Sequence, residues 1–202
     1  MMKRILFLML LLLILAGCTR TEVPSEVPAE TPTEQEAPAE TQEDTTAENA
    51  AAIPLGSFEA QTLTGETLTE GYFSNADLTV INVWATFCGP CKEEMPVLAQ
   101  LDQELENVQI LGIVTDVIDQ SGSPDSAQVE LAQELADLAG CQYPNLILNK
   151  SLAMLGFASL SAVPATLFVD SDGNLVGQGF YGALNEEGWR SVIAEQLELA
   201  GA

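Results

Sequence analysis

Two apolar runs separated by a segment of helical length constrain the fold of this chain more than any other feature. The first run is Leu78–Trp84 (LTVINVW), and the second covers residues 108–115 (VQILGIVT). Near-continuous apolar runs of this length are typical of strands that are buried on both faces of a sheet. The charged segment between them, residues 89–106, has a helical pattern, so the order strand, helix, strand predicts parallel strands joined by a crossover.

Shorter elements are expected on both sides of these strands. Residues 58–63 and 66–68 flank Thr64 and Gly65, which predicts an amino-terminal hairpin. The turn sequence DSDGN predicts a second hairpin late in the chain. The remaining predicted elements are the two arms of that hairpin at 166–169 and 175–180, a short strand near 146–148, a brief helix at 151–157 and a final helix at 185–199.

A further helix is expected between the strand at residues 108–115 and the short strand near residues 146–148. The turn sequence SGSPD, residues 121–125, starts an amphipathic segment that should end near residue 139. Four apolar side chains recur along it at helical spacing. We expect these four to face the core: Val129, Leu131, Leu135 and Leu138.

The first residues have the layout of an export signal. A short cationic start that includes Lys3 and Arg4 precedes the apolar run at residues 5–15, which is too short to span a membrane comfortably. The sequence LAGC that ends at Cys18 resembles the lipobox of bacterial lipoproteins. The resemblance implies cleavage of residues 1–17 and lipidation of Cys18. An ordinary secretory signal and an uncleaved anchor are the alternatives.

Residues 18–52 are rich in Glu, Pro and Thr and contain no cluster of large apolar side chains. Such a composition buries too little apolar surface to offset the entropy of the chain, so we expect an acidic, disordered tether. The folded domain is then expected at residues 53–202. The chain has 30 acidic and 6 basic residues, a balance that argues against nucleic acid as a partner because phosphates would be repelled.

Cys88 and Cys91 form a CxxC motif just after the first apolar run. A structural disulfide is one interpretation, although so short a loop removes little entropy from the unfolded chain. A zinc site is disfavoured, because the sequence has no histidine and its only other cysteines are Cys18 and Cys141. A redox centre explains the spacing, since a sulfur at the start of a helix is favoured as a thiolate and a second sulfur one turn later can resolve a mixed disulfide.

Several segments together resemble one family. They are VINVW before the motif, CGPC, the following KEEMP, and AVPATLFVDSDGNLV late in the chain. The chain resembles the thioredoxin superfamily, and more closely the membrane-anchored thiol-disulfide oxidoreductases of the TlpA and ResA type. The resemblance implies a thioredoxin-like α/β fold with a central mixed sheet flanked by helices, an amino-terminal hairpin and a central helical insertion.

The same resemblance assigns roles to four residues of the motif segments. Cys88 would be the nucleophile and Cys91 the resolving thiol, and Val163–Pro164 matches the cis-proline site of the family. Glu94 matches a glutamate that tunes the thiols, with Asn82 at the position of a buried aspartate in thioredoxin. The alternatives are a plain turn proline at Pro164 and a solvated helix carboxylate at Glu94.

The resemblance implies a reductase at the extracytoplasmic face of the membrane, anchored by its lipid. Its partners would be disulfide-containing client proteins, for example in cytochrome c maturation, and a membrane electron donor of the CcdA or DsbD kind. No cofactor is expected, because no nucleotide or flavin motif is present. A disulfide-donating oxidase or isomerase, a thiol peroxidase and a non-catalytic binding module are the alternatives. Peroxidase chemistry is disfavoured by Ala85, where peroxidases carry threonine, and by a single arginine beyond the tether, Arg190.

Overall fold

The computed structural model describes residues 52–201, and within them a mixed sheet forms the centre. Seven strands form this sheet in the order β1-β8-β7-β4-β5-β6, with β9 also paired to β7. A separate pair, β2 and β3, forms the amino-terminal hairpin. The strands are β1 (Ile53–Pro54), β2 (Glu59–Gln61), β3 (Thr67–Thr69), β4 (Leu78–Trp84), β5 (Val108–Val114), β6 (Asn145–Ile147), β7 (Ala165–Asp170), β8 (Asn174–Leu175) and β9 (Phe180–Tyr181).

Strand β4 lies in the middle and pairs along its length on both edges. It runs parallel to β5, with Leu78 opposite Val108 and Trp84 opposite Val114, and antiparallel to β7. All seven of its residues are buried. The prediction of a strand buried on both faces is therefore confirmed, and the sheet is mixed as expected for the fold class.

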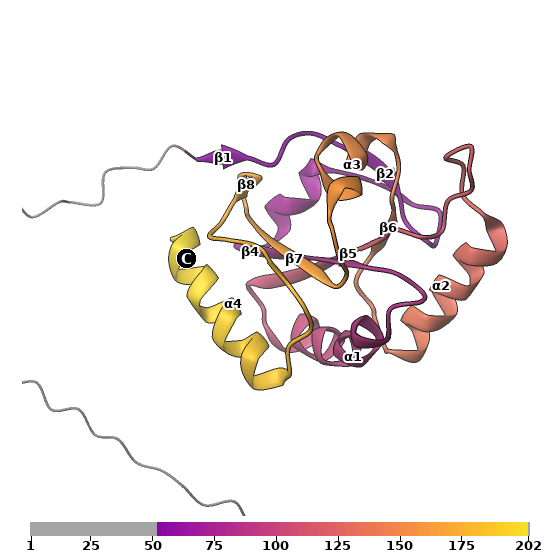
Figure 1. The fold of residues 1–202 in the computed structure, drawn as a ribbon. Helices are drawn as coiled ribbons and strands as arrows, with labels where there is room; N and C mark the ends of the chain where they lie inside the picture. Colours follow the sequence, from indigo (N-terminus) through magenta and orange to yellow (C-terminus); the bar gives the residue numbers. More distant parts are fainter. Residues whose placement is uncertain (1–51, 202) are drawn as a thin grey trace, which may run out of the picture. The chain divides into compact units, whose positions relative to one another are not determined.

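Helices cover both faces of the sheet. Figure 1 shows α1 and α4 along one face, while α3 and the short helix η1 lie on the other. The helical elements are η1 (Glu70–Asn75), α1 (Gly89–Glu104), α2 (Ser126–Leu138), α3 (Lys150–Met154), η2 (Phe157–Ser159) and α4 (Glu186–Ala200). The mixed sheet with helices on both faces is the thioredoxin-like fold that the resemblance implied, and α2 is the expected central helical insertion.

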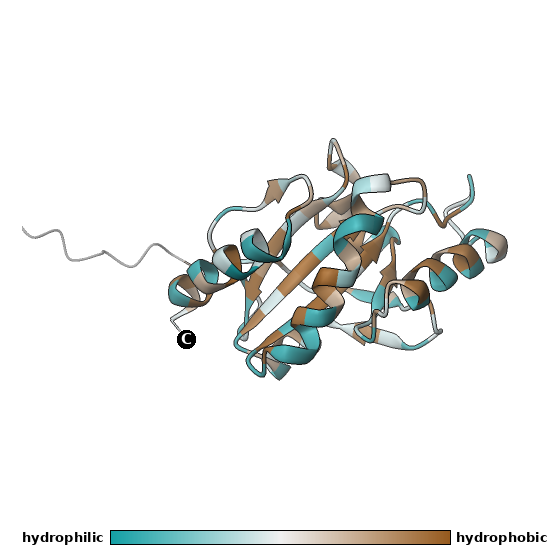
Figure 2. Cartoon of the chain, turned by 90° about the horizontal axis from the view of Figure 1, so that it is seen from below, coloured by the Kyte–Doolittle hydropathy of each residue, from teal (hydrophilic) through white to brown (hydrophobic). Residues whose placement is uncertain are grey.

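Each face of the sheet has its own apolar core. On one face, Leu98 of α1, Trp189 of α4 and Ile110 of β5 belong to one apolar cluster and are fully buried. On the other, Phe73 of η1 packs with Leu152 of α3. Figure 2 shows the apolar strands behind α1, whose outward side is hydrophilic. The hydrophobic effect thus holds the helices in place through one apolar stripe on each.

The orientation of α2 differs from the prediction. Leu131 and Leu138 are 40% and 78% exposed, whereas Ala132 and Ala136 are buried. Val129 and Leu135 are partly buried, as expected. The sequence carries two overlapping apolar stripes, and the helix packs through the one with alanines because small side chains allow closer approach to the sheet. The expectation that Leu131 and Leu138 face inward is wrong.

The boundaries of the other elements agree with the prediction to within a few residues. Helix α1 ends at Glu104, before residue 106, because Leu105 adopts an extended conformation. The late hairpin is present as β7 and β8, and the expected second arm at 175–180 is split into β8 and β9. The brief helix expected at 151–157 is the pair α3 and η2.

The predictions for the amino-terminal part lie outside the described residues. They concern the signal at residues 1–17, the lipidated Cys18 and all of the tether except its last residue. Within residues 52–201, no helix is both long and apolar enough to cross a bilayer.

Gly112 provides a test of the packing between β5 and β6. A Cβ at this position would collide with Oδ1 of Asn145, the atom that accepts a hydrogen bond from the buried indole of Trp84 at 2.8 Å. We therefore expect Gly112→Ala to lower the free energy of unfolding by about 3 kcal/mol, from overpacking together with the lost hydrogen bond.

Urea unfolding of the purified protein measures this change. Gly89→Ala is the matched control, because a Cβ at Gly89 has no atom within 4 Å, and we expect it to change stability by less than about 0.5 kcal/mol. Equal stability of the two variants would show that Asn145 is not held in this position.

Candidate active site

Cys88 lies at the junction between the loop after β4 and the start of α1. It is the N-cap residue of α1, and its Sγ accepts a hydrogen bond from the backbone N–H of Cys91 at 3.1 Å. Pro90 occupies the first turn, where a helix needs no N–H donor. The exposed N–H groups of the helix start favour negative charge at this place, and therefore favour a thiolate at Cys88.

The two cysteines form a disulfide, and their surroundings are unequal. Cys91 is 0% exposed and Cys88 is 5% exposed. Next to Cys88, the residues Phe87, Gly89 and Pro90 are exposed, with Phe87 at 75%. A partner protein can thus reach Cys88 but not Cys91, which is the arrangement that a nucleophile and a resolving thiol require.

The loop before Cys88 is held by polar contacts that the sequence interpretation missed. Asp116, just after β5, accepts hydrogen bonds from the backbone N–H of Thr86 at 3.0 Å and from its hydroxyl at 2.6 Å. Lys92, an exposed residue, donates to the carbonyl of Thr86 at 3.2 Å. A polar residue at the carboxyl end of a neighbouring parallel strand was the signal available in the sequence.

Glu94 is buried one turn after Cys91. Its side chain is 1% exposed. One carboxyl oxygen accepts from Nδ2 of Asn82 at 2.9 Å and the other from the backbone N–H of Leu184 at 3.3 Å. The alternative of a solvated helix carboxylate is therefore wrong for Glu94, whereas the neighbouring Glu93 is exposed.

Burial raises the pKa of Glu94 from its usual 4.5 to about 7, and the hydrogen bonds from Asn82 and Leu184 act in the opposite direction. Residues three apart on a helix share one side, so Glu94 and Cys91 lie on the same side of α1, and both are fully buried. A carboxyl group with a pKa near 7 can exchange a proton at neutral pH. Glu94 is therefore a candidate for proton exchange on the helix that carries the cysteine pair.

Pro164 follows a cis peptide bond, as the resemblance implied for Val163–Pro164. Pro164 is buried, and its carbonyl accepts a hydrogen bond from the N–H of Gly182 at 2.9 Å. Val163 packs against the apolar cluster that contains both Cys88 and Cys91. The structure therefore brings the cis-proline loop and the cysteine pair together from distant parts of the sequence.

Cys141, the third cysteine of the folded part, stays reduced and half-buried. Burial raises the pKa of its thiol to about 11. A thiol with so high a pKa is almost entirely protonated at neutral pH and reacts slowly. Among residues 52–201, no group of three or more His, Cys, Asp or Glu side chains is placed to hold a metal ion.

Comparison with known proteins identifies the family. Residues 51–193 match the model of the AhpC/TSA family. The chain is 30% identical over 161 residues to the thiol:disulfide interchange protein HelX of Rhodobacter capsulatus, which covers 76% of this chain and 82% of HelX. It is 25% identical over 122 residues to the thiol-disulfide oxidoreductase ResA of Halalkalibacterium halodurans, which covers 59% of this chain and 60% of that ResA.

Solved structures agree with this result at the level of the fold. A thiol:disulfide interchange protein of the thioredoxin family from Chlorobium tepidum superposes with a TM-score of 0.60 at 19% identity, covering 73% of this chain and 98% of that protein. The cysteine pair at a helix start, the adjoining cis-proline loop and these relatives lead to one conclusion. The chain belongs to the AhpC/TSA family of thioredoxin-like proteins and is a thiol-disulfide oxidoreductase.

Proposed function

We propose that the protein is a lipid-anchored reductase that delivers electrons to disulfides of client proteins outside the cytoplasm. The unequal exposure of the two cysteines carries this proposal. Cys88 keeps 5% of its surface exposed at an electropositive helix start, while Cys91, one turn later on the helix that carries Glu94, is fully buried. This arrangement supports transfer of a disulfide between proteins through one attacking sulfur.

The reaction starts from the reduced pair. The Cys88 thiolate attacks one sulfur of the client disulfide, which forms a mixed disulfide and releases the other client sulfur as a thiolate. Cys91 then gives up its proton and attacks Cys88, which releases the second client sulfur. Two electrons have passed to the client, and Cys88 and Cys91 are left as the disulfide seen in the structure.

Glu94 fits the second step of this cycle. Its carboxylate form can accept the proton of Cys91 as that sulfur attacks, and Asn82 orients the carboxyl through its hydrogen bond. Pro164 and the loop around it would lie against the client chain next to Cys88. The oxidised pair must then receive two electrons from a membrane carrier, for which a protein of the CcdA or DsbD kind is the proposed donor.

The membrane location rests on the sequence of the first residues. The apolar run and the LAGC sequence support cleavage before Cys18 and its acylation, and several acyl chains would hold the protein firmly at the outer face of the membrane. Apocytochrome c is one proposed client, in keeping with the family that the chain resembles. Other oxidised extracytoplasmic proteins suit the same chemistry.

The cysteine roles predict two different phenotypes. We expect Cys88→Ser to lower the rate of insulin disulfide reduction by about a thousandfold or more, because the attacking sulfur is lost. Cys91→Ser should still attack but not resolve, so mixed disulfides with clients should accumulate at Cys88. Non-reducing electrophoresis followed by mass spectrometry of the trapped species measures this and identifies the clients.

Two outcomes would contradict the reductase. One is a high reduction potential of the Cys88–Cys91 pair, measured by glutathione titration. A value of about −120 mV would equal that of dedicated disulfide donors. The other is rapid consumption of hydrogen peroxide by the purified protein, with little reduction of insulin. The first would indicate an oxidase, and the second would indicate a peroxidase.

The anchor predicts a clear result in a bacterial host. We expect the wild-type chain to incorporate labelled palmitate and to sediment with membranes, because Cys18 carries the acyl chains. Cys18→Ala should incorporate no label. Cys141→Ala is the matched control and should be labelled like the wild type. Labelling of the Cys18→Ala variant would exclude this site of attachment.

The raised pKa of Glu94 predicts that the free energy of unfolding depends on pH. Its pKa is higher in the folded protein, about 7, than the usual 4.5, so the folded state binds more protons than the unfolded state between these values. The contribution of protonated Glu94 to the free energy of unfolding is then fully present below pH 4.5 and is lost as the pH rises through about 7. The lost contribution is about 3 kcal/mol. We expect Glu94→Gln to remove this decline in urea unfolding at pH 5, 6, 7 and 8.

The same variant also tests the catalytic role. The pH profile of Cys88 alkylation in the reduced protein should change shape near pH 7 in the wild type and lose that feature in Glu94→Gln, because no carboxyl remains to titrate beside the thiols. Glu93→Gln, on the exposed side of the same helix turn, should behave like the wild type in both experiments. Identical profiles for all three proteins would leave Glu94 without influence on the thiols.

A further inference from the structure

Two buried polar atoms on neighbouring strands of the central sheet have no hydrogen-bond partner. They are Oδ1 of Asn82 on β4 and Oγ1 of Thr166 on β7. Both residues are fully buried, so neither atom reaches the solvent at the surface. A buried polar group without a partner destabilises a folded protein, and most such groups are paired. Two of them on adjacent strands therefore indicate a contact with a purpose.

The register of the strands places the two side chains next to each other. Asn82 lies directly opposite Thr166 in the antiparallel pair of β4 and β7. Side chains at opposite positions of such a pair project from the same face of the sheet, with their Cβ atoms about 5 Å apart. A rotation of Thr166 about its Cα–Cβ bond can therefore bring its hydroxyl within hydrogen-bonding distance of the Asn82 amide.

The residues on the outer edges of this strand pair offer neither side chain another partner. On the other edge of β7, the residue opposite Thr166 is Phe180, whose ring has no hydrogen-bonding group. On the other edge of β4, the residue opposite Asn82 is Gly112, which has no side chain. Across the strands, the Thr166 hydroxyl and the Asn82 amide thus have only each other.

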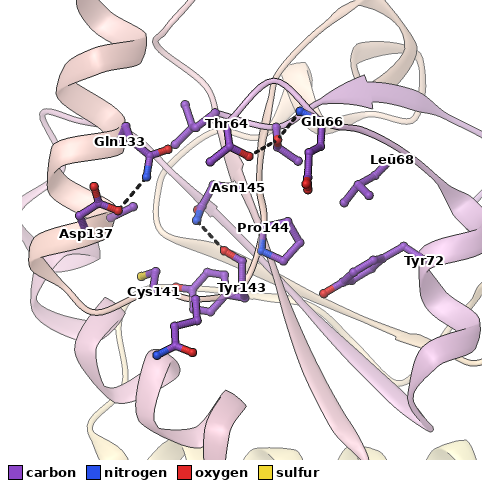
Figure 3. A pocket seen from close by; sticks show the side chains of 14 residues that line it. Thr64, Glu66, Leu68, Tyr72, Gln133, Asp137, Cys141, Tyr143, Pro144 and Asn145 are labelled. Carbon is purple, nitrogen blue, oxygen red and sulfur yellow. Dashed lines mark hydrogen bonds between the residues drawn. The ribbon is translucent and has the colours of Figure 1, made fainter.

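Asn145 of β6 is the next polar residue in this row across the sheet, and both ends of its amide are in use. Its Oδ1 accepts from the indole of Trp84 at 2.8 Å. Its Nδ2 donates to the carbonyl of Tyr143 at 3.3 Å, the bond drawn between these two residues in Figure 3. Asn145 therefore does not compete with Thr166 for the free oxygen of Asn82.

The hydrogen bond from Asn82 to Glu94 decides the direction of the missing bond. Nδ2 of Asn82 donates to one carboxyl oxygen at 2.9 Å, so the end left over is Oδ1, which can only accept. Thr166 must then donate its hydroxyl hydrogen. With the amide reversed, Thr166 would accept instead, and its own hydrogen would stay without an acceptor because Phe180 provides none.

We propose that Thr166 is a positioning residue for Glu94 that acts through Asn82. Its hydroxyl donates to Oδ1 of Asn82 and holds the amide with its N–H groups toward the carboxyl, which stabilises the carboxylate. The catalytic consequence rests on the proposed function, in which this carboxylate accepts the proton of Cys91. Strand β7 thus carries both Pro164 and, two residues later, a control on the proton acceptor.

The groups that face Glu94 from the surrounding elements leave its titration clear near pH 7. On α1, Cys91 is held in the disulfide of the oxidised protein and does not titrate. From α4 and the loop before it, Trp189 and Leu184 present uncharged N–H groups. From the segment before β6 comes Tyr143, and burial raises the pKa of its hydroxyl well above the usual value.

Carboxyl-carbon NMR of the oxidised, full-length protein measures the titration of Glu94 directly. The protein is isotope-labelled at its glutamate carboxyl groups, and the signal missing from Glu94→Gln belongs to Glu94. We expect Thr166→Val, which keeps the shape and loses the hydroxyl, to raise the pKa of Glu94 by about 0.7, because a bond that favours the carboxylate is lost. Thr166→Ser keeps the hydroxyl and should titrate like the wild type.

Thr79→Val is the matched control. Thr79 is also a fully buried threonine of β4, and its Oγ1 accepts from Gln109 at 2.9 Å. Because it lies three positions before Asn82, it projects from the opposite face of the sheet. We expect this variant to lose stability and to leave the pKa of Glu94 unchanged. Shifts of equal size in both valine variants would overturn the positioning role, since they would reflect a general loosening of the sheet.

A measurement on the wild type keeps the test decisive even if Thr166→Val does not fold. The Cβ signal of Thr166 should titrate with the midpoint of Glu94, and this titration should be absent from Glu94→Gln. The Cβ signal of Thr79 should not follow it. A Thr166 signal that does not follow Glu94, or an unshifted Glu94 in folded Thr166→Val, would overturn the proposal.

Kinetics separate the positioning role from the reductase itself. At pH 7, a pKa raised by about 0.7 lowers the carboxylate fraction of Glu94 about threefold, so Thr166→Val should resolve mixed disulfides about threefold more slowly than the wild type. At pH 9 the two proteins should resolve them at equal rates. Failure of the wild type to reduce insulin would overturn the reductase, while the carboxyl titrations would still decide the role of Thr166.

Discussion

The complete burial of β4 is the constraint on which the rest of the structure depends. Its backbone is hydrogen-bonded on both edges, and its side chains are covered on both faces, so it has a single possible position in the sheet. The chain leaves β4 at Trp84 and must turn at once into α1. That turn places Cys88 at the start of a helix, where 5% of its surface stays exposed, and places the fully buried Cys91 one turn later. The geometry of the site therefore depends on the position of β4, which also contributes Asn82, the hydrogen-bond donor to Glu94.

The burial of the Glu94 carboxyl lowers the stability of its charged form and raises its pKa. Burial of Glu94 disfavours its charged form, and two hydrogen bonds offset only part of this effect. A protein selected for stability alone would carry an apolar residue at this position, because removing water from a charge is expensive. A carboxyl group with a pKa of about 7 is partly protonated at neutral pH, where a surface glutamate is ionised.

Helix α2 shows how packing chooses between two apolar stripes of one helix. Ala132 and Ala136 pack in the cluster that contains the cysteine pair, whereas Leu131 and Leu138 are exposed. The prediction failed here for a definite reason: the sequence of α2 contains two apolar stripes of similar strength, and hydropathy alone favours leucine over alanine as the buried residue. Packing reverses this preference where a helix lies close to a sheet. The contact of Asp116 with Thr86 was missed for a similar reason, since it joins residues 30 positions apart.

The sequence by itself determined the two central strands, the helix between them, the hairpins and the identity of the cysteine pair, because each depends on local pattern or on a short motif. Only the tertiary structure decided that Cys91 is sealed while Cys88 is accessible, and that Val163 and Pro164 lie beside them. It also decided that Glu94 is buried although Glu93, its neighbour in sequence, is exposed. The physical reason is that exposure and pKa depend on which distant segments cover a side chain, and a single helix turn in the sequence does not contain that information.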